Sequence, residues 1–152
     1  MEGWREKAIR EAVEDFRKIK EIFSELKGIS EPKEEKFEKS FRARARELPS
    51  SISVSLLPPL AFCYSQVEGK WEEILGLLEG KKAKIDESPL AYGLYLYFAL
   101  KHLFGSQKAR DPLACFLEIT ERKPASLAFL KTRLLVYLLE MKRLAEAEFR
   151  AT

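Results

Sequence analysis

The chain has few of the residues on which catalytic and metal sites depend. Histidine occurs once, at His102, and cysteine occurs twice, at Cys63 and Cys115. Zinc sites gather three or four such ligands, usually at short sequence spacings, and nucleophilic catalysis needs a base beside the nucleophile. The two common glycine-rich phosphate-binding motifs, G-x-x-x-x-G-K-[ST] and G-x-G-x-x-G, are both absent from the sequence. The sequence therefore predicts a protein that is not an enzyme, with no catalytic residues, no metal site and no cofactor.

Long apolar runs are missing as well. The most apolar stretch, residues 90–100, is far shorter than the ~20 residues that a bilayer-spanning helix needs, and the charged N-terminus has no apolar signal segment. Both cysteines lie in apolar runs, which indicates buried thiols in a reducing compartment, with a disulfide as the alternative. We expect a soluble, cytoplasmic protein with no membrane partner.

A strong excess of one charge is also absent. The net charge is +3, from 27 basic and 24 acidic residues. An excess this small does not predict nucleic-acid binding, so any such site must come from local clustering of basic side chains.

Helical periodicity is present almost throughout the 152 residues, a length that suits one domain. Short connections between helices favour antiparallel neighbours. We expect an all-α fold in which residues 1–152 form a single compact bundle of six to seven helices, with long first and last helices and no sheet. An apolar stripe marks the first helix: Ala12, Phe16, Ile19, Phe23 and Leu26, extended by Trp4 and Ile9.

Proline and glycine positions predict where the other helices begin and end. Gly28 is expected to follow the first helix, and Ser30 or Glu31 to cap the second, which should end close to Pro49. The stretch "SSISVSLL" alternates like a strand but has no partner strand, so we interpret it as a connection or as an irregular first turn of the next helix. Later helices are expected over residues 58–67, 71–80, 90–104, 113–121 and 124–149, with caps at Ser88 and Asp111. The aromatic run 92–98 fits either base stacking or, as we favour, the core.

The segment "FRARARELPSSI" contains the most suggestive basic cluster. Around a helix with ~100° per residue, the apolar line Phe37, Phe41, Ala45 and Leu48 leaves four cations on the opposite side: Lys36, Lys39, Arg42 and Arg46. The one-turn spacing of Arg42 and Arg46 suits two adjacent phosphates. The alternative is a solvated surface balanced by neighbouring glutamates. Arg44 falls at the edge of the apolar line, where it should cover the core rim or pair with a carboxylate.

A second basic cluster lies on the last helix. It consists of Lys142, Arg143 and Arg150, which are interspersed with Glu140, Glu146 and Glu148. These acidic neighbours make it the weaker candidate for phosphate binding.

The same segment resembles the hallmark of the small helical subunit of the type III-B (Cmr) CRISPR RNA-targeting complex. That family shows an aromatic and a basic residue, a short helical stretch, Leu-Pro-Ser/Thr-x-Ile, an Asn-Gly-Leu turn, Ala-Phe and a long final helix. "SVSLLPP", residues 53–59, departs from the pattern, because the family usually has its glycine turn there. The matching positions here are Phe41, Arg42, Arg46, Leu48, Pro49, Ser50, Ile52 and Leu60 to Phe62.

The resemblance implies a non-catalytic subunit that acts in antiviral defence. Copies of the subunit would stack in a filament beside other subunits of the effector complex and contact the backbones of guide RNA and target RNA. Arg42 and Arg46 occupy the family's basic positions, and Arg44 occupies a variable one. The alternative function is a helical protein–protein adaptor that makes no contact with nucleic acid.

Overall fold

The protein is a bundle of helices. The computed structural model describes residues 3–26 and 33–150, and within these ranges it has seven α-helices, one short 3₁₀ helix and no strand. The expected all-α bundle with long first and last helices is confirmed. Gly28, Ser30 and Glu31 lie outside the described residues. The elements are α1 (Trp4–Leu26), α2 (Lys33–Val54), α3 (Leu57–Gln66), α4 (Trp71–Leu78), α5 (Glu87–Phe104), η1 (Lys108–Arg110), α6 (Pro112–Glu121) and α7 (Pro124–Glu148).

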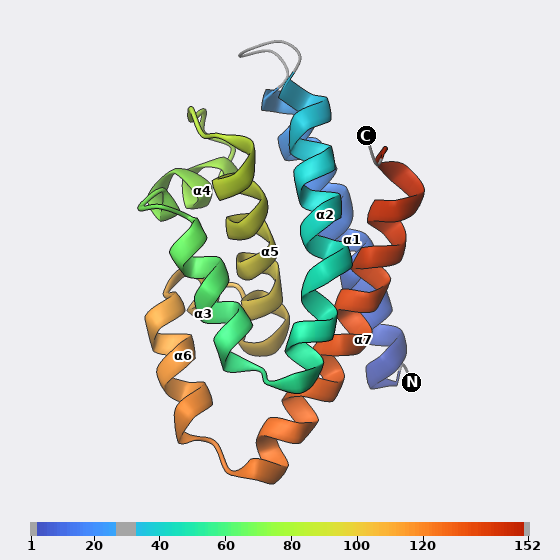
Figure 1. Ribbon diagram of the computed structural model, residues 1–152, viewed down its shortest axis with the longest axis vertical. Coiled ribbons are helices and arrows are strands. Elements are labelled where there is room, and N and C mark those ends of the chain that lie inside the picture. The colour runs from blue at the N-terminus through green and yellow to red at the C-terminus, as the bar shows by residue number, and fades with distance from the viewer. Residues whose placement is uncertain (1–2, 27–32, 151–152) are drawn as a thin grey trace.

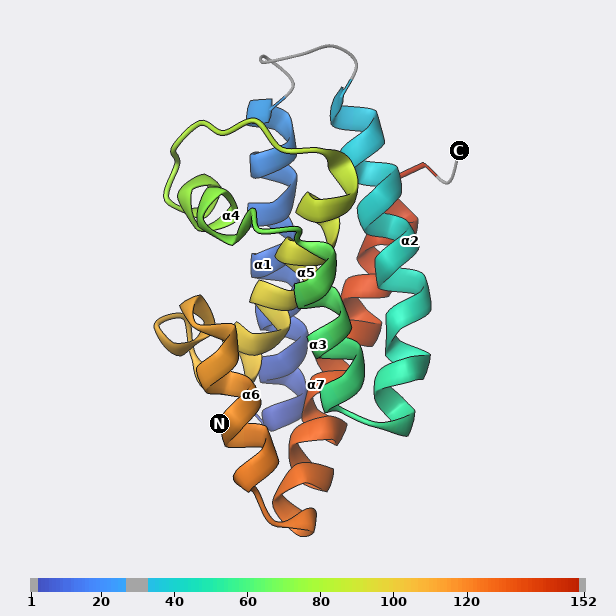
Figure 2. The ribbon, with the colours of Figure 1, turned by 60° about the vertical axis from the view of Figure 1, so that its left-hand side comes forward.

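Helix α5 is the centre of the bundle. Helices α1 and α7 lie side by side and run in the same direction, while α2 and α5 run the opposite way (Figure 1). Helices α3, α4 and α6 pack on the other side of α5 (Figure 2). Residues 89–100 are all buried, so α5 is apolar on every side. The tyrosines of this run therefore belong to the core, as expected. No described helix is long and apolar enough to span a membrane.

The apolar stripe of α1 is confirmed with one exception. All five of its main members are buried, but Ile9 is 40 % exposed. Ala8, one turn before Ala12, takes the inward position instead and is fully buried. The extension of the stripe through Ile9 is therefore wrong.

Helix α2 does not end at Pro49, which contradicts the sequence prediction. Proline in a helix interior costs ~3 kcal/mol, because it removes one hydrogen bond and clashes with the preceding turn. Ile52 continues the buried line one turn after Leu48 and is fully buried, which returns ~1.5–3 kcal/mol. The buried ring of Pro49 adds to this. Because burial offsets the defect, the strand-like stretch that follows stays helical to Val54.

Proline and glycine set the ends of the later helices. Pro112 opens α6, and the Asp111 carboxylate accepts a hydrogen bond from the Ala114 backbone N–H at 3.2 Å. Helix α5 begins at Glu87, slightly earlier than expected, and it ends at Gly105, whose φ of 93° suits glycine.

A glycine also sets the distance between two helices. At Gly93, in the middle of α5, an added Cβ would lie 2.0 Å from the Ile74 Cδ1 of α4. Helix α4 therefore packs directly on the backbone of α5 at this point.

Candidate nucleic-acid interface

The two predicted basic clusters meet where α2 and α7 pack against each other. Arg46 Nε on α2 lies 3.2 Å from Glu146 Oε2 on α7. Lys39 and Arg42 share the side of α2 that carries Arg46, since they precede it by two turns and one turn. Lys142 and Arg143 precede Glu146 by one turn on α7. We call this surface the α2–α7 seam and define it by Lys36, Lys39, Arg42, Arg46, Lys142, Arg143, Glu146 and Arg150.

Three cations of the seam, Lys39, Arg46 and Arg143, are held in surface ion pairs. Lys39 lies 3.2 Å from Glu35, and Arg143 lies 3.6 Å from Glu140. The Arg46 side chain is 56 % exposed. Exposed pairs of this kind contribute ~0–1 kcal/mol, so a phosphate can compete for these cations at little cost.

Arg42 is less accessible than the sequence predicts. The residue is half-buried, and its Nε is covered without a hydrogen-bond partner among the described residues. A long arginine stem commonly lies along apolar surface and leaves only its tip in water. Lys36 and Arg46 are exposed, whereas Lys39 is half-buried like Arg42. The four cations of α2 are therefore unequal in exposure.

Arg44 has the structural role that the sequence predicts. Its guanidinium lies 4.8 Å from the centre of the Tyr92 ring, and its Nε lies 2.8 Å from the Glu47 carboxylate without hydrogen-bond alignment. The side chain is only 21 % exposed. Arg44 is thus held between α2 and α5 by an aromatic ring and a carboxylate.

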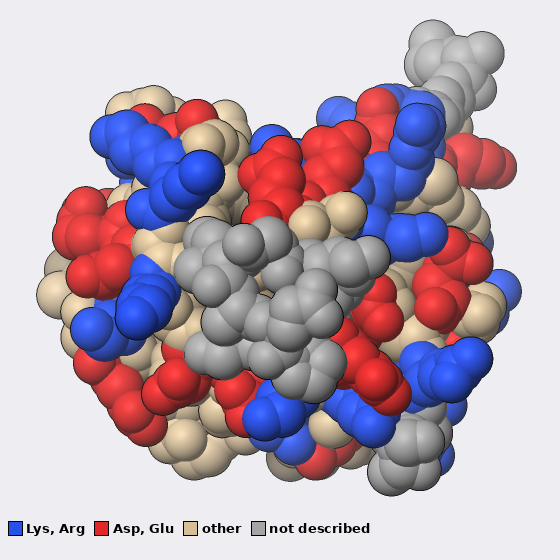
Figure 3. All heavy atoms as spheres, turned by 90° about the horizontal axis from the view of Figure 1, so that it is seen from above, with Lys and Arg blue, Asp and Glu red and all other residues tan. Residues whose placement is uncertain are grey.

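Basic and acidic side chains alternate at the end of the bundle. Figure 3 looks onto the end near the start of α2, and Lys, Arg, Asp and Glu are interspersed around the grey atoms. The visible part of this end has no continuous surface of one charge. The α2–α7 seam is therefore the better candidate for contact with a polyanion.

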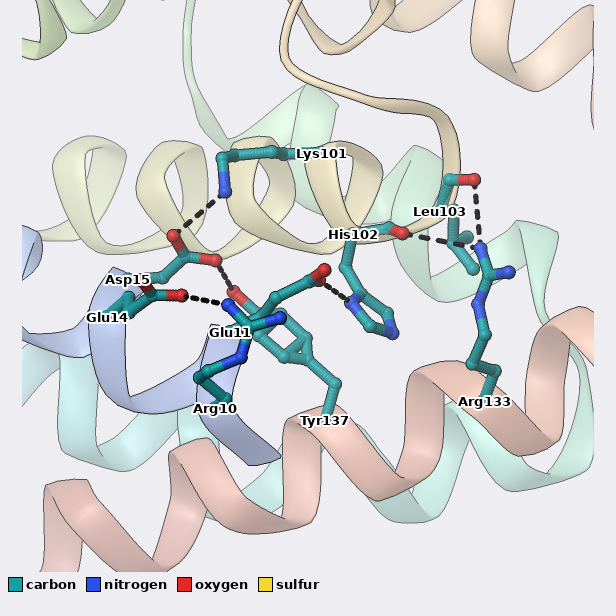
Figure 4. Close-up of polar contacts among 9 residues, drawn as sticks. All are labelled: Arg10, Glu11, Glu14, Asp15, Lys101, His102, Leu103, Arg133 and Tyr137. Carbon is teal, nitrogen blue, oxygen red and sulfur yellow. Dashed lines mark hydrogen bonds and ion pairs between the residues drawn. The ribbon is translucent and has the colours of Figure 1, made fainter. Parts of the chain in front are cut away.

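A buried polar network joins α1, α5 and α7, and the sequence analysis did not find it. Asp15 is 6 % exposed, and its carboxylate accepts hydrogen bonds from Lys101 Nζ at 2.9 Å and from the Tyr137 hydroxyl at 2.6 Å (Figure 4). The sequence signal that could have indicated this network is the position of Asp15 beside Phe16 in the apolar stripe of α1. Burial and the Asp15 carboxylate raise the pKa of Tyr137 well above its ordinary value, so this hydroxyl stays a donor.

His102 lies next to this network and is held by Glu11. Its Nδ1 lies 2.6 Å from Glu11 Oε2, and its ring stacks on Tyr137 with 4.4 Å between the centres. Burial lowers the pKa of His102, although the Glu11 carboxylate acts in the opposite direction. Arg133, not His102, donates to the last carbonyls of α5, at 3.1 and 3.3 Å. His102 is thus paired through its ring with Glu11.

The cysteines are unsuited to nucleophilic chemistry. Both are free and buried, so the disulfide alternative is wrong. Burial raises the pKa of Cys63 to about 12 and that of Cys115 to about 11. Since the thiolate is the reactive form, both side chains are inert at neutral pH. In residues 3–26 and 33–150 no three His, Cys, Asp or Glu side chains gather as a metal site would require.

Comparison with known proteins adds no relative. The chain matches no protein-family model, no curated protein and no solved structure among those compared.

An apolar hollow lies at the turn between α2 and α3. Val54 is 82 % exposed and Phe62 is 50 % exposed, and both line a depression with Leu48, Pro58 and Pro59. Large apolar side chains gathered on a surface are typical of protein–protein contacts.

Proposed function

We propose that this protein is a non-catalytic small subunit of a type III-B CRISPR ribonucleoprotein and that its α2–α7 seam contacts the phosphate backbones of guide RNA and target RNA. In this role it would stack along the inner filament with copies of itself and with other subunits. Arg42 and Arg46, with Lys36 and Lys39, would contact successive phosphates. Lys142, Arg143 and Arg150 would extend the contact onto α7.

The observation that carries the proposal is the meeting of two basic clusters from distant parts of the sequence. Arg46 and Glu146 come within 3.2 Å, so the cations of α2 and α7 line one surface. RNA backbone binding needs such a row of cations and no base-specific groups. The resemblance of the α2 segment to the CRISPR subunit family supplies the identity of the complex.

The decisive experiment is RNA titration of an Arg42→Ala and Arg46→Ala double variant at two salt concentrations. Each phosphate contact on a single strand contributes about 0.7 to the slope of log K against log salt, so the slope should fall by about 1.4. Lys81→Ala with Lys82→Ala is the matched control, because it removes the same charge from an exposed loop between α4 and α5. If the arginine variant binds like its parent both alone and in the assembled complex, the site assignment is wrong.

Substitution of Glu146 provides a second test, in which RNA binding should become stronger instead of weaker. The Glu146 carboxylate competes with phosphate for Arg46, at 3.2 Å. Glu146→Gln keeps the shape of the side chain and removes the charge, so it should strengthen RNA binding by up to about fivefold, the value of one exposed ion pair. Weaker binding by this variant would mean that the pair positions Arg46 for RNA instead of occupying it.

The exposed apolar hollow favours a second function, that of a protein–protein adaptor. Val54 and Phe62 would then insert into a partner protein and would be the residues that matter most. Phe62→Ser should abolish co-purification of that partner from the native host and leave RNA binding unchanged. Co-purification of RNA that depends on Arg46 but not on Phe62 supports the RNA function.

A further inference from the structure

A small pocket lies at the junction of α1, α5 and α7, away from the α2–α7 seam. We call it the His102 pocket. Its volume is about 180 Å³, and it is lined by Trp4, Lys7, Glu11, His102, Phe129 and Arg133. Pockets that enclose drug-sized ligands measure ~300–1,000 Å³. This one therefore has room for a single ring.

His102 has an unpaired acceptor beside this pocket, closed to solvent in the free protein. The Glu11 carboxylate can only accept a hydrogen bond, so Nδ1 carries the proton and Nε2 of the neutral ring is a bare acceptor. The His102 side chain is 4 % exposed, and its Nε2 has no partner in the part of the chain that the structure describes. Figure 4 shows the Nε2 edge turned away from Glu11, toward the side on which Arg133 lies.

Arg133 adds an unpaired donor. One of its terminal nitrogens donates to the carbonyls of His102 and Leu103 and so fixes the guanidinium. Its Nε–H is buried and also lacks a partner among residues 3–26 and 33–150. Buried polar groups are nearly always paired in native proteins. Two unpaired atoms from residues that line one pocket therefore indicate a bound group with a complementary donor and acceptor.

The walls of the pocket favour a flat ligand. Trp4 and Phe129 meet edge to face with ring centres 6.2 Å apart, and Phe129 is 52 % exposed. Aromatic walls bind the faces of flat rings. Lys7 adds a cation at the same site, which suits a phosphate attached to the ring.

We propose that the His102 pocket binds a flat single-ring heterocycle that carries both an N–H donor and a carbonyl acceptor, as uracil does. Both acceptor and donor atoms are closed to a water-sized probe in the free protein, so the lining side chains must shift when the ring enters. The ring N–H then donates to His102 Nε2, and the carbonyl accepts from the Nε–H of Arg133. The ring can come from a free nucleoside or nucleotide, or from an unpaired base of an RNA strand. The free-ligand form does not depend on the proposed RNA function.

The test is a titration of the whole protein with uridine, followed by NMR. The two tryptophans give two indole N–H signals. That of Trp4 should shift, while that of Trp71, which donates to the Arg110 carbonyl at 2.9 Å, should not. His102 is the only histidine, so its Nε2 resonance reports directly on the new hydrogen bond. We expect saturation at millimolar uridine and about tenfold weaker binding of N3-methyluridine, which keeps the ring but lacks the N–H.

Variants and ligand forms separate this proposal from the RNA function. His102→Phe should weaken uridine binding about tenfold, whereas the seam variant Arg42→Ala with Arg46→Ala should not change it. Trp4→Ala, at a half-buried wall, serves if His102→Phe does not fold. Uridine monophosphate should bind more tightly than uridine through Lys7, and oligouridine tests the strand-borne base.

Three results would overturn the proposal. The first is the absence of any shift at Trp4 and His102 with uridine, its monophosphate or oligouridine. The second is equal binding of uridine and N3-methyluridine. The third is a crystal structure grown with uridine in which only an ordered water lies between His102 Nε2 and Arg133. Oligouridine binding that depends on the seam arginines but not on His102 would refute the pocket and leave the RNA function standing.

Discussion

Removal of the hydroxyl group should change the stability of this protein in opposite directions at two buried tyrosines. Tyr95 and Tyr137 are the largest fully buried side chains of the core. The Tyr137 hydroxyl donates to Asp15 at 2.6 Å, whereas that of Tyr95 has no partner among the described residues. Replacement by phenylalanine removes one oxygen at each site and keeps the ring. The difference between the two variants therefore isolates the hydrogen bond from the packing.

The sizes of the two effects follow from the partners. A hydrogen bond to a charged group contributes ~1.5–3 kcal/mol, and Lys101 remains on Asp15 after the change, so Tyr137→Phe should lose about 2 kcal/mol. Tyr95→Phe removes a hydroxyl that is desolvated without compensation and should gain up to about 1 kcal/mol. At ~2–4 °C per kcal/mol for a chain of this size, Tm should fall by about 4–8 °C in the first variant and rise slightly in the second.

Urea unfolding followed by far-UV circular dichroism measures both values. The slope m should stay that of the parent, because the surface exposed on unfolding does not change. Equal losses in the two variants would show that ring packing, and not the bond to Asp15, sets the cost, and this would refute the reasoning.

Three further predictions concern helix packing, capping and alkaline stability. Gly93→Ala should cost ~1–3 kcal/mol through overpacking. Gly76→Ala, whose added Cβ would meet only the Lys81 side chain at an ordinary contact distance of 3.7 Å, should gain ~0.5–1 kcal/mol; urea unfolding measures both. Asp111→Ala should cost ~1 kcal/mol, unlike Asp86→Ala, whose carboxylate makes no capping bond; thermal unfolding compares them. Cys63, with its pKa raised from 9.0 to about 12, should make stability fall by ~1.4 kcal/mol per pH unit across that window, because only the unfolded thiol ionises there. Cys63→Ala should flatten that part of the pH profile.

Local sequence patterns predicted most of the fold because most of its helices have local signals. The stripe from Ala12 to Leu26 and the capped start at Asp111 each depend on residues within a few turns of one another. Pro49 failed as an end signal because its effect is decided by distant contacts. Ile52, three residues after the proline, is fully buried in the core. The local sequence around Pro49 does not show this burial, because it depends on helices that are distant in the sequence.

The polar network shows why sites are harder to predict than helices. Asp15 is separated from Lys101 by 86 positions and from Tyr137 by 122 positions. A lone aspartate within an apolar stripe indicates that some partner exists, but nothing local indicates which. The helical wheel correctly placed Arg44 at the edge of the apolar line, since that position depends on one helix, but it did not predict that Arg42 is half-buried. A helical wheel could not show that Glu146, 100 positions after Arg46, lies beside that arginine.

Helix α7 contributes residues to both proposed sites. The distance between these residues decides whether a substitution at one site affects binding at the other. Arg133 serves the His102 pocket and Glu146 serves the seam, and the 13 positions between them correspond to ~20 Å along the helix. Substitutions farther apart than ~7–10 Å without shared partners usually act additively. Changes at Arg46 or Glu146 should therefore leave uridine binding intact, and changes at His102 should leave the salt dependence of RNA binding intact. If both sites responded to either set of changes, the common cause would have to lie in α7 itself.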